Sequence, residues 1–226
     1  MAKTISIAID GPAGAGKSTI AKRLAKELGF YYVDTGAIYR TVAYFMDLLD
    51  ISPKDVDGVS RYIDELTVEI EYDEEGLQHM IMNGMDVTND IRTPDISQKA
   101  SLISAHAVVR DMLLDMQRDV AKKHNVIMDG RDIGTVVLPR ATVKFFLTAS
   151  AEVRARRRTD EMLAKGQKAD YKKVLDDIMK RDYQDSHREV APLKQAKDSV
   201  VLDTSDLNED QVIEKMKEII GKKLAE

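Results

Sequence analysis

Cysteine is absent from this 226-residue chain, so disulfide bonds, thiolate metal sites and cysteine nucleophiles are excluded. Long hydrophobic runs are absent too, since no stretch of about 18 apolar residues is available to span a membrane. The apolar start of the chain is interrupted by Ser6 and ends at Asp10, which is too short for the apolar region of a signal peptide. These absences predict a cytoplasmic protein with no membrane partner.

An excess of positive charge is also missing, because the formal net charge is −5. This balance argues against general nucleic-acid binding. The charges are unevenly distributed: residues 45–95 hold 14 acidic and 3 basic side chains, whereas residues 131–188 hold 14 basic and 9 acidic ones. An acidic region and an arginine-rich region on one chain indicate that anions are handled locally, although solvated helix faces would give the same pattern.

Apolar residues follow strand-like and helix-like spacing in alternation along most of the chain. Short apolar runs predict strands over 3–10, 30–33, 126–128, 143–147 and 200–202. Helical spacing predicts helices over 18–28, 37–49, 94–124, 152–166, 171–188 and 209–224. Three further short strands, separated by turn signals, are expected over 66–73, 76–83 and 85–88. We therefore expect an α/β fold with a mostly parallel sheet, helices on both faces and a small antiparallel insert.

The segment Gly11–Ser18 (GPAGAGKS) matches the P-loop pattern, with a predicted strand before it and a predicted helix after it. Its glycines let successive backbone N–H groups point into one concavity, and the helix adds its positive dipole end. Lys17 supplies a charge for the β- and γ-phosphates of ATP, and Ser18 supplies a hydroxyl ligand for Mg²⁺. The residues expected to bind the donor are Gly11, Pro12, Ala13, Gly14, Ala15, Gly16, Lys17, Ser18 and Thr19.

Three classes of P-loop protein compete for this motif. A GTPase requires an N-K-x-D guanine motif, which the chain lacks. A motor or transporter ATPase requires a long apolar strand that ends in Asp-Glu, and no such pair is present. The strand over 126–128 ends instead at Asp129, which can hold a Mg²⁺-bound water and is not followed by a glutamate. A small-molecule kinase remains and fits the length of the chain.

Arginines near the ends of predicted elements indicate what the acceptor is. The five with polar neighbours are Arg40, Arg110, Arg131, Arg181 and Arg188. Guanidinium groups match phosphate oxygens two at a time, and a phosphate acceptor needs such neutralisation but no general base. A hydroxyl acceptor would need a carboxylate base, a role open to Asp34 or Asp129. Ion pairing with a neighbouring acid explains any single arginine equally well.

The helix expected after Ser150 is rich in arginine, and Arg154 and Arg158 lie four residues apart on one face. A lid with such side chains would stabilise a moving phosphoryl group and exclude water. A solvated basic helix is the alternative. For the whole protein two alternatives remain open: a kinase for a hydroxyl-bearing metabolite, and a module that binds ATP without catalysis.

Several motifs give the chain a resemblance to bacterial cytidylate kinases over about residues 4 to 220. They are residues 7–19 (IAIDGPAGAGKST), 34–40 (DTGAIYR), 128–139 (MDGRDIGTVVLP), 181–188 (RDYQDSHR) and 191–193 (APL). The phosphate loop is shared with many families, whereas the DGRDIGTVV and RDxxDxxR segments are much more specific to this one.

The resemblance implies a P-loop nucleoside monophosphate kinase fold with a five-stranded parallel sheet, in a single domain over 1–226. Its core would span about 1–62, 97–150 and 189–226, a monophosphate-binding insert about 63–96, and an arginine-rich lid about 151–188. The implied activity is transfer of the γ-phosphoryl group of MgATP to CMP or dCMP, giving CDP or dCDP without a covalent enzyme intermediate. We expect a monomer.

The resemblance also implies roles for individual residues. Arg40 and Arg131 match positions that hold the acceptor phosphate; Ser101, Arg110, Asp132 and Arg188 match base contacts; Arg181 and Asp185 match sugar contacts. Thr35 stands where some family members have serine, and the hydroxyl keeps that substrate-binding role. The expected catalytic residues are Lys17, Arg131, Arg154, Arg158 and Arg181. The expected metal contacts are Ser18 and, through water, Asp129.

Cytosine is a sensible base for this set of side chains. Its amino group can donate to Asp132, and its acceptor atoms can receive hydrogen bonds from Arg110, Arg188 and Ser101. Uracil would set a carbonyl oxygen against the Asp132 carboxylate, a buried mismatch that costs about 1–3 kcal/mol.

Overall fold

The central sheet has five parallel strands, as predicted. The structure, a computed structural model, describes residues 4–225. Its main sheet has the order β2-β6-β1-β7-β8 and consists of β1 (Ser6–Asp10), β2 (Tyr31–Asp34), β6 (Val126–Gly130), β7 (Val143–Thr148) and β8 (Val200–Asp203). Lys3, which the sequence placed in the first strand, lies outside the described residues. Because all five strands run in one direction, their carboxyl ends meet at one edge.

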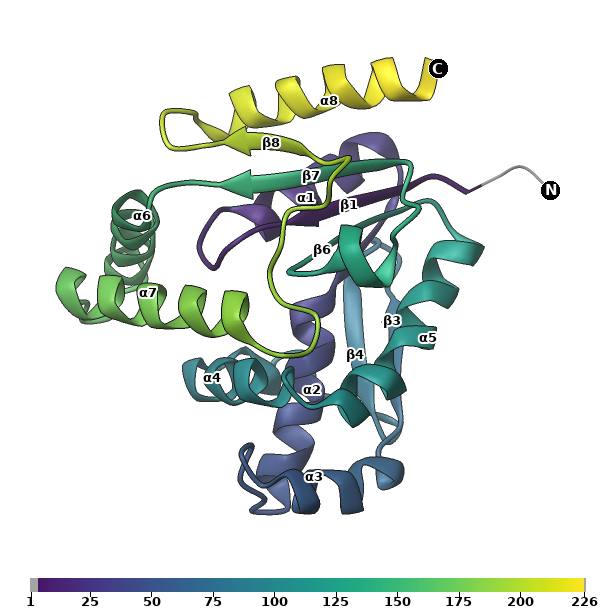
Figure 1. Cartoon of the computed structure of the whole chain (residues 1–226), viewed down its shortest axis with the longest axis vertical. Helices are drawn as coiled ribbons and strands as arrows, with labels where there is room; N and C mark the ends of the chain where they lie inside the picture. The colour runs from purple at the N-terminus through teal and green to yellow at the C-terminus, as the bar shows by residue number, and fades with distance from the viewer. Residues whose placement is uncertain (1–3, 226) are drawn as a thin grey trace.

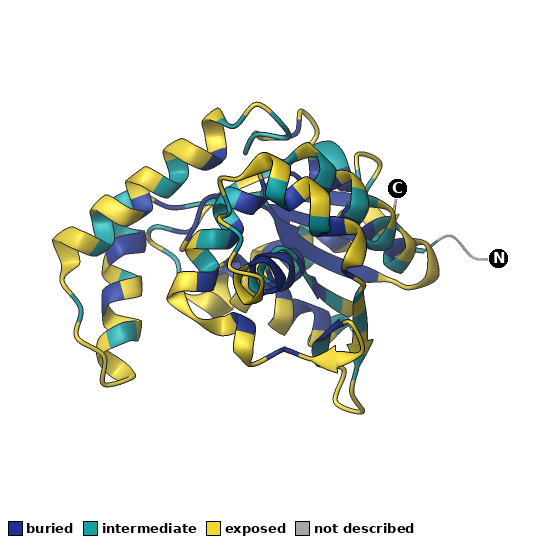
Figure 2. Cartoon of the chain, turned by 90° about the horizontal axis from the view of Figure 1, so that it is seen from below, coloured by how far each residue is buried: buried dark blue, intermediate teal, exposed yellow. Residues whose placement is uncertain are grey.

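Helices cover both faces of this sheet (Figure 1). On one face, α1 (Lys17–Leu28) and α8 (Glu209–Ala225) bury apolar residues such as Leu24 and Met216. On the other face, α2 (Thr35–Leu48) and α5 (Ala107–Lys123) do the same. The inner strands β1, β6 and β7 are therefore buried from both sides, as the dark sheet in Figure 2 shows, which explains their continuous apolar runs. The edge strands β2 and β8 are partly exposed.

The helical region expected over 94–124 is two helices rather than one. The first, α4 (Pro94–Ile103), ends before α5, and His106 between them has extended backbone angles. The His106 ring Nε2 lies 2.8 Å from the carbonyl oxygen of Pro53, a contact that the local sequence does not predict. The break frees the carbonyl of Ser104, which Arg110 then binds at 3.1 Å.

A short helix, α3 (Val56–Tyr62), was not predicted. It is N-capped by Asp55, whose carboxylate accepts a hydrogen bond from the N–H of Gly58 at 3.0 Å. Two 3₁₀ turns, η1 (Ile63–Glu65) and η2 (Asp90–Arg92), flank the insert.

The predicted antiparallel insert is present. It consists of β3 (Val68–Tyr72), β4 (Gln78–Met82) and β5 (Met85–Asp86), in that order. The insert is fastened to β2, because the Tyr72 hydroxyl donates to the carbonyl of Tyr32 at 3.0 Å and the Gln78 side chain accepts from the N–H of Asp34 at 2.7 Å. It is thereby held beside the carboxyl end of β2.

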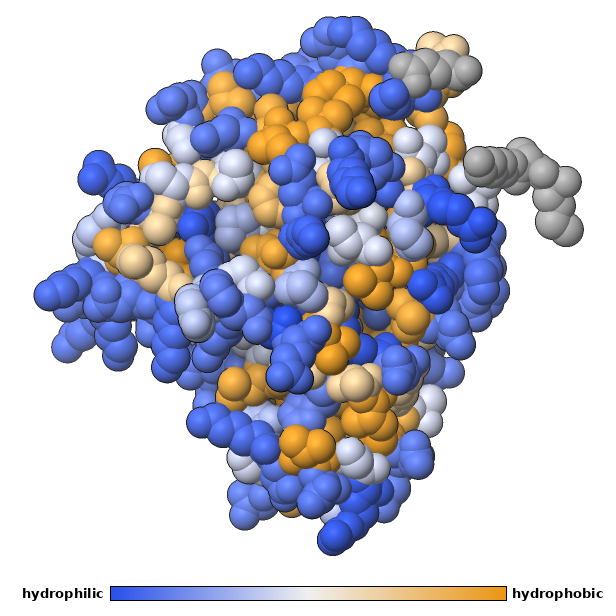
Figure 3. All heavy atoms as spheres, viewed as in Figure 1, coloured by the Kyte–Doolittle hydropathy of each residue, from blue (hydrophilic) through white to orange (hydrophobic). Residues whose placement is uncertain are grey.

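Two charged helices, α6 (Ala151–Ala164) and α7 (Tyr171–His187), pack against each other as a hairpin. Figure 1 shows them standing away from the sheet at the left, and in Figure 3 this end of the molecule carries mainly hydrophilic side chains. Between β6 and β7 lies η3 (Ile133–Val137), a single π-helical turn. Within residues 4–225, no helix combines the length and the apolar character that crossing a membrane requires.

Candidate active site

The phosphate loop links the end of β1 to the start of α1. Gly11 has φ +150°, and a Cβ atom there would lie 1.9 Å from the carbonyl oxygen of Leu147, so only glycine fits. Gly16 begins α1 in the left-handed region. The loop folds around Lys17, whose ammonium group is buried and donates to the carbonyl of Pro12 at 2.8 Å.

The charge of Lys17 is held in an unfavourable place. Burial, and then the like charge of Arg131, lowers the pKa of Lys17 to about 7 against the opposing charge of Asp129. An anion beside the ammonium group would reverse this destabilisation. The loop therefore has the electrostatics of a site that binds polyanions.

Asp129, at the carboxyl end of the central strands, is held by two hydroxyl groups. Ser18 donates to one of its carboxylate oxygens at 2.8 Å and Tyr32 to the other at 2.9 Å. Burial, and then the charge of Asp34, raises the pKa of Asp129 to about 6. The oxygens of Ser18 and Asp129 form a hard donor set that suits Mg²⁺.

Arginines from three elements converge beside the loop. Arg40 of α2 pairs with Asp34 at 3.0 Å, and Arg131 after β6 donates to Asp185 of α7 at 2.7 Å. Arg181 of α7 faces them: burial, and then the like charges of Arg131 and Arg40, lowers its pKa to about 10. The buried Nε atoms of Arg40 and Arg181 have no hydrogen-bond partner among the described residues. Two carboxylates pair with this cluster, but the three guanidinium groups still leave donors unused, as a site for an oxyanion would.

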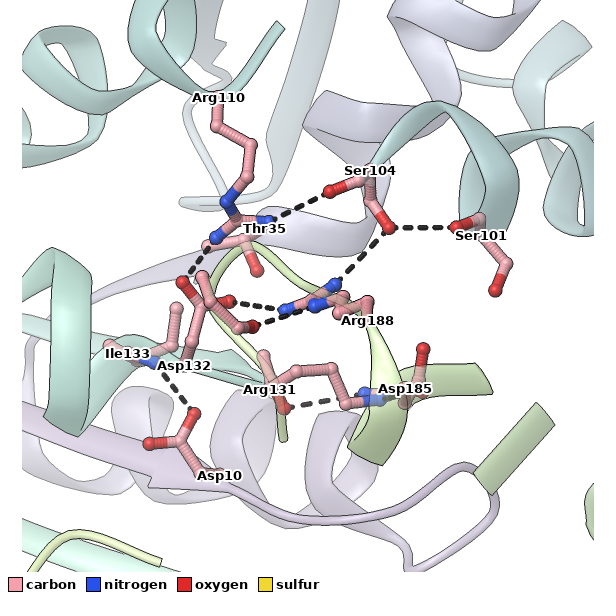
Figure 4. A network of polar contacts seen from close by, with 12 residues as sticks. Asp10, Thr35, Ser101, Ser104, Arg110, Arg131, Asp132, Ile133, Asp185 and Arg188 are labelled. Atoms are coloured by element: carbon pink, nitrogen blue, oxygen red, sulfur yellow. Dashed lines mark hydrogen bonds and ion pairs between the residues drawn. The ribbon is translucent and has the colours of Figure 1, made fainter. Parts of the chain in front are cut away.

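A second polar cluster surrounds Asp132, which is buried between two arginines (Figure 4). One carboxylate oxygen pairs with Arg110, and the other accepts from Arg188 at 3.0 Å. Arg188 also donates to the Ser104 hydroxyl at 3.2 Å. Fixed donors and acceptors of this kind can read the edge of a planar base.

Ser101 lies at the border of this cluster with its hydroxyl group unused. The Ser101 Oγ is buried and has no hydrogen-bond partner in residues 4–225, while its backbone carbonyl accepts from the Ser104 hydroxyl at 2.9 Å. A buried hydroxyl without a partner is unfavourable unless a ligand completes it. Thr35 differs, because its hydroxyl already donates to the backbone carbonyl of Asp129 at 2.7 Å.

With this geometry established, comparison with known proteins identifies the family. A family model described as Cytidylate kinase matches residues 7–222. The chain belongs to the cytidylate kinase family.

Curated cytidylate kinases from three bacteria match the chain over nearly its whole length. The protein of Clostridium tetani is 46% identical over 96% of this chain and 93% of its own length. Those of Carboxydothermus hydrogenoformans and an Exiguobacterium species are 49% and 48% identical, over 96% and 97% of this chain and 97% and 98% of their own lengths. Among solved structures, a shikimate kinase from Bacteroides thetaiotaomicron aligns at 16% identity with a TM-score of 0.49, over 96% of this chain and 98% of that one, too remote to bear on the substrate.

In this member of the cytidylate kinase family, only one of the two proposed lid arginines reaches the phosphate loop. Arg154 is buried and donates to the carbonyl of Ala13 at 2.8 Å, while pairing with Asp182 at 2.6 Å. Arg158 is half exposed and pairs with Glu161 at 3.3 Å. The described contacts of Arg158 therefore do not include the phosphate loop.

Two residues of this cytidylate kinase site were not found from the sequence. Tyr32 is an ordinary strand residue until the pairing of β2 with β6 brings its hydroxyl to Asp129. Ser104 becomes a partner of Arg188 only because the helical region breaks there. The paired tyrosines of β2 and the small polar residues near Ser101 were the available signals, and neither is specific.

Proposed function

We propose that the protein transfers the γ-phosphoryl group of MgATP to CMP or dCMP, giving CDP or dCDP. The observation that carries this proposal is the buried Asp132 held between Arg110 and Arg188, beside an arginine cluster with unused donors and a phosphate loop. The family membership of the chain supports the same reaction.

The donor would be held by the loop residues 11–19, with Lys17 against the β- and γ-phosphates. Ser18 would contact Mg²⁺ directly and Asp129 through water, since both present hard oxygens that already lie 2.8 Å apart. Mg²⁺ held there would supply positive charge to offset the charge that develops on the phosphates. Tyr32 keeps the Asp129 carboxylate turned toward Ser18.

The acceptor phosphate would be bound by Arg40 and Arg131, and Arg181 would stabilise the group in transfer. These guanidinium groups repel one another, so that an anion between them gains more from them than from isolated arginines. Arg154 would act from the lid, since it already reaches the loop carbonyl of Ala13. Arg158 would act beside Arg154 only after the proposed lid had closed over the phosphate loop.

The cytosine base would lie against Asp132, Arg110, Arg188 and Ser101. The free Ser101 hydroxyl supports this, because it is a buried donor that awaits an acceptor. Asp185 and Arg181 would contact the sugar, and Thr35 would support the site through its bond to Asp129. The division into a core, an insert over about 63–96 and a lid over about 151–188 is part of the same proposal.

A coupled assay that detects ADP tests the proposal, with ATP and Mg²⁺ offered together with CMP, dCMP, UMP, AMP or buffer alone. We expect turnover with CMP and dCMP to exceed turnover with UMP and AMP. If a hydroxyl-bearing metabolite is offered as well, turnover with it and none with any monophosphate would favour the kinase for a hydroxyl-bearing metabolite. Binding of ATP without acceptor-stimulated turnover would favour a sensing module.

A further inference from the structure

Asp10 is a buried carboxylate that none of the roles above uses. It is the last residue of β1, is 3% exposed, and directly precedes Gly11 of the phosphate loop. Its two oxygens accept hydrogen bonds from the backbone N–H groups of Ile133 and Gly134, both at 2.7 Å. Figure 4 shows Asp10 reaching Ile133 just below Asp132.

Keeping a charge at this position is costly, so it calls for an explanation. Burial raises the pKa of Asp10 to about 6, even though the bonds from Gly134 and Ile133 lower it and so favour the charged form. An ionised carboxylate is the side chain that can accept from two neighbouring N–H groups at once with equivalent oxygens. The arrangement is thus built to hold two consecutive peptide groups.

Those two peptide groups determine where Asp132 sits. The N–H of Ile133 belongs to the same planar peptide unit as the carbonyl of Asp132, so fixing it fixes that plane. Asp132 itself, with φ −142° and ψ 25°, lies between the end of β6 and the turn η3, outside any regular ladder. The carbonyl of Asp132 accepts from the N–H groups of Val136 and Val137 at 2.8 and 3.2 Å. Asp10 adds the side-chain link that ties this peptide to β1.

The space around this contact leaves little room for adjustment. A Cβ atom on Gly134 would lie 3.1 Å from Lys144 Cδ and 3.2 Å from an Asp10 carboxylate oxygen. The carboxylate and the turn are consequently in close contact, and a change on either side moves the other.

We propose that Asp10 is a positioning residue for acceptor recognition, which ties the loop that carries Arg131 and Asp132 to the phosphate loop. This inference rests on the proposed function, in which Asp132 reads the base and Arg131 holds the acceptor phosphate. Since Asp10 is bonded covalently to Gly11, one side chain sets the relative position of donor and acceptor sites. In-line transfer is sensitive to such placement, and a displacement of about 1 Å can cost about 100-fold in rate.

The test is Asp10→Asn, which has nearly the same shape but only one acceptor atom. One of the two N–H groups then faces an NH₂ donor, and the turn must shift. We expect kcat/KM for CMP to fall about 10-fold or more, chiefly through KM for CMP, with a smaller loss for UMP. The CMP-to-UMP ratio therefore falls, whereas the ATP dissociation constant measured without acceptor changes less than about 3-fold.

A matched control is Asp55→Asn, which removes a carboxylate from the backbone N–H of Gly58 at the start of α3. This variant should keep the wild-type ratio. If Asp10→Asn fails to fold by circular dichroism, Gly134→Ala presses on the same contact from the other side with Asp10 intact, and it should lower the ratio in the same direction.

The outcomes separate this inference from the proposed function. A wild-type protein that shows no preference for CMP over UMP contradicts the proposed function. A wild-type preference that Asp10→Asn, or Gly134→Ala in its place, leaves unchanged overturns the role of Asp10. Equal losses for CMP, UMP and ATP binding would also overturn it, since they indicate only general support of the fold.

Discussion

Single side chains in the proposed site are held in states that a ligand would relieve. The ammonium group of Lys17 is buried, donates to its own loop at Pro12, and is repelled by Arg131. Such groups are costly to the empty protein and favourable in a complex with anions. Replacing such side chains one at a time should therefore change ligand binding and turnover in predictable ways.

Replacing Lys17 by Met should abolish turnover and leave the fold intact. The variant keeps the length of the side chain and removes the charge that would meet the β- and γ-phosphates, so we expect kcat to fall by at least about 100-fold. The coupled assay gives kcat, and circular dichroism checks the fold. Unchanged activity in a folded variant would refute the assignment of the donor site.

Replacing Asp132 by Ala should reduce activity with CMP more than with UMP. The carboxylate accepts from the cytosine amino group in the proposed complex but opposes the uracil carbonyl, so the ratio of kcat/KM values should fall by about 10-fold or more. The matched control is Asp185→Ala, which removes a partner of Arg131 on the sugar side. That variant should affect both nucleotides alike, and equal losses for Asp132→Ala would remove the argument for base recognition.

The buried carboxylate of Asp10 should make stability depend on pH. Its pKa is about 6 in the folded protein and 3.8 in the unfolded reference. Between these pH values the folded state binds more protons, so the free energy of unfolding falls as pH rises from about 4 to about 6. The difference amounts to up to about 3 kcal/mol. Urea unfolding of the wild type should therefore show a steeper decline across this window than that of Asp10→Asn, and parallel curves would contradict the pKa.

At the scale of elements, the strands and most helices could be predicted because their signals are local. The inner strands β1, β6 and β7 are buried on both faces, which requires apolar runs in the sequence. The break before His106 could not be predicted, since it is fixed by a contact with Pro53, 53 positions away in the chain.

In the candidate site, too, local features could be predicted and features fixed by distant contacts could not. The phosphate loop is one continuous segment, and the motif residues around Asp132 were found through a family resemblance. Tyr32 and Ser104 were not predicted, because their hydrogen-bond partners Asp129 and Arg188 lie 97 and 84 positions away. The periodicity of a single sequence does not reveal contacts at such separations. Asp10 accepts a hydrogen bond from Ile133, 123 positions away in the chain, so its role could not be inferred from the sequence alone.

The segment that follows α7 contains a backbone strain that a substitution can measure. Ala191 has φ +48°, and its carbonyl accepts from Arg188 Nε at 2.6 Å. Glycine removes the steric cost of about 1 kcal/mol, although it also gains entropy in the unfolded chain. Ala191→Gly should therefore leave the urea midpoint unchanged or raise it.

The control for this prediction is Ala196→Gly in the same segment. Ala196 is buried and is not among the residues with positive φ, so its replacement should destabilise the protein by about 1 kcal/mol. An equal loss of stability in the two variants would show that Ala191 carries no strain.

At the scale of the whole molecule, the arginine cluster joins parts that are otherwise separate. Arg40 belongs to α2, Arg131 follows β6, and Arg181 belongs to the hairpin of α6 and α7. Burial, and then repulsion from Arg131 and Arg40, lowers the pKa of Arg181, while the ion pair of Arg131 with Asp185 joins the hairpin to the core. An oxyanion bound between them would convert that repulsion into attraction.

Inorganic phosphate should consequently stabilise the whole chain without any nucleotide. At millimolar phosphate, compared with chloride at the same ionic strength, we expect the Tm to rise by several degrees, since about 1 kcal/mol corresponds to about 2–4 °C for a chain of this size. In Arg181→Ala the Tm in chloride should be equal to or above that of the wild type, because one repelling charge is gone. The rise in Tm caused by phosphate should fall by about half or more in this variant, because one of the side chains that bind the phosphate is gone.

Arg158→Ala is the control, since that side chain is half exposed beside Glu161 and should keep the full increment in Tm. If Arg181→Ala kept the full increment as well, the three arginines would not bind an anion jointly.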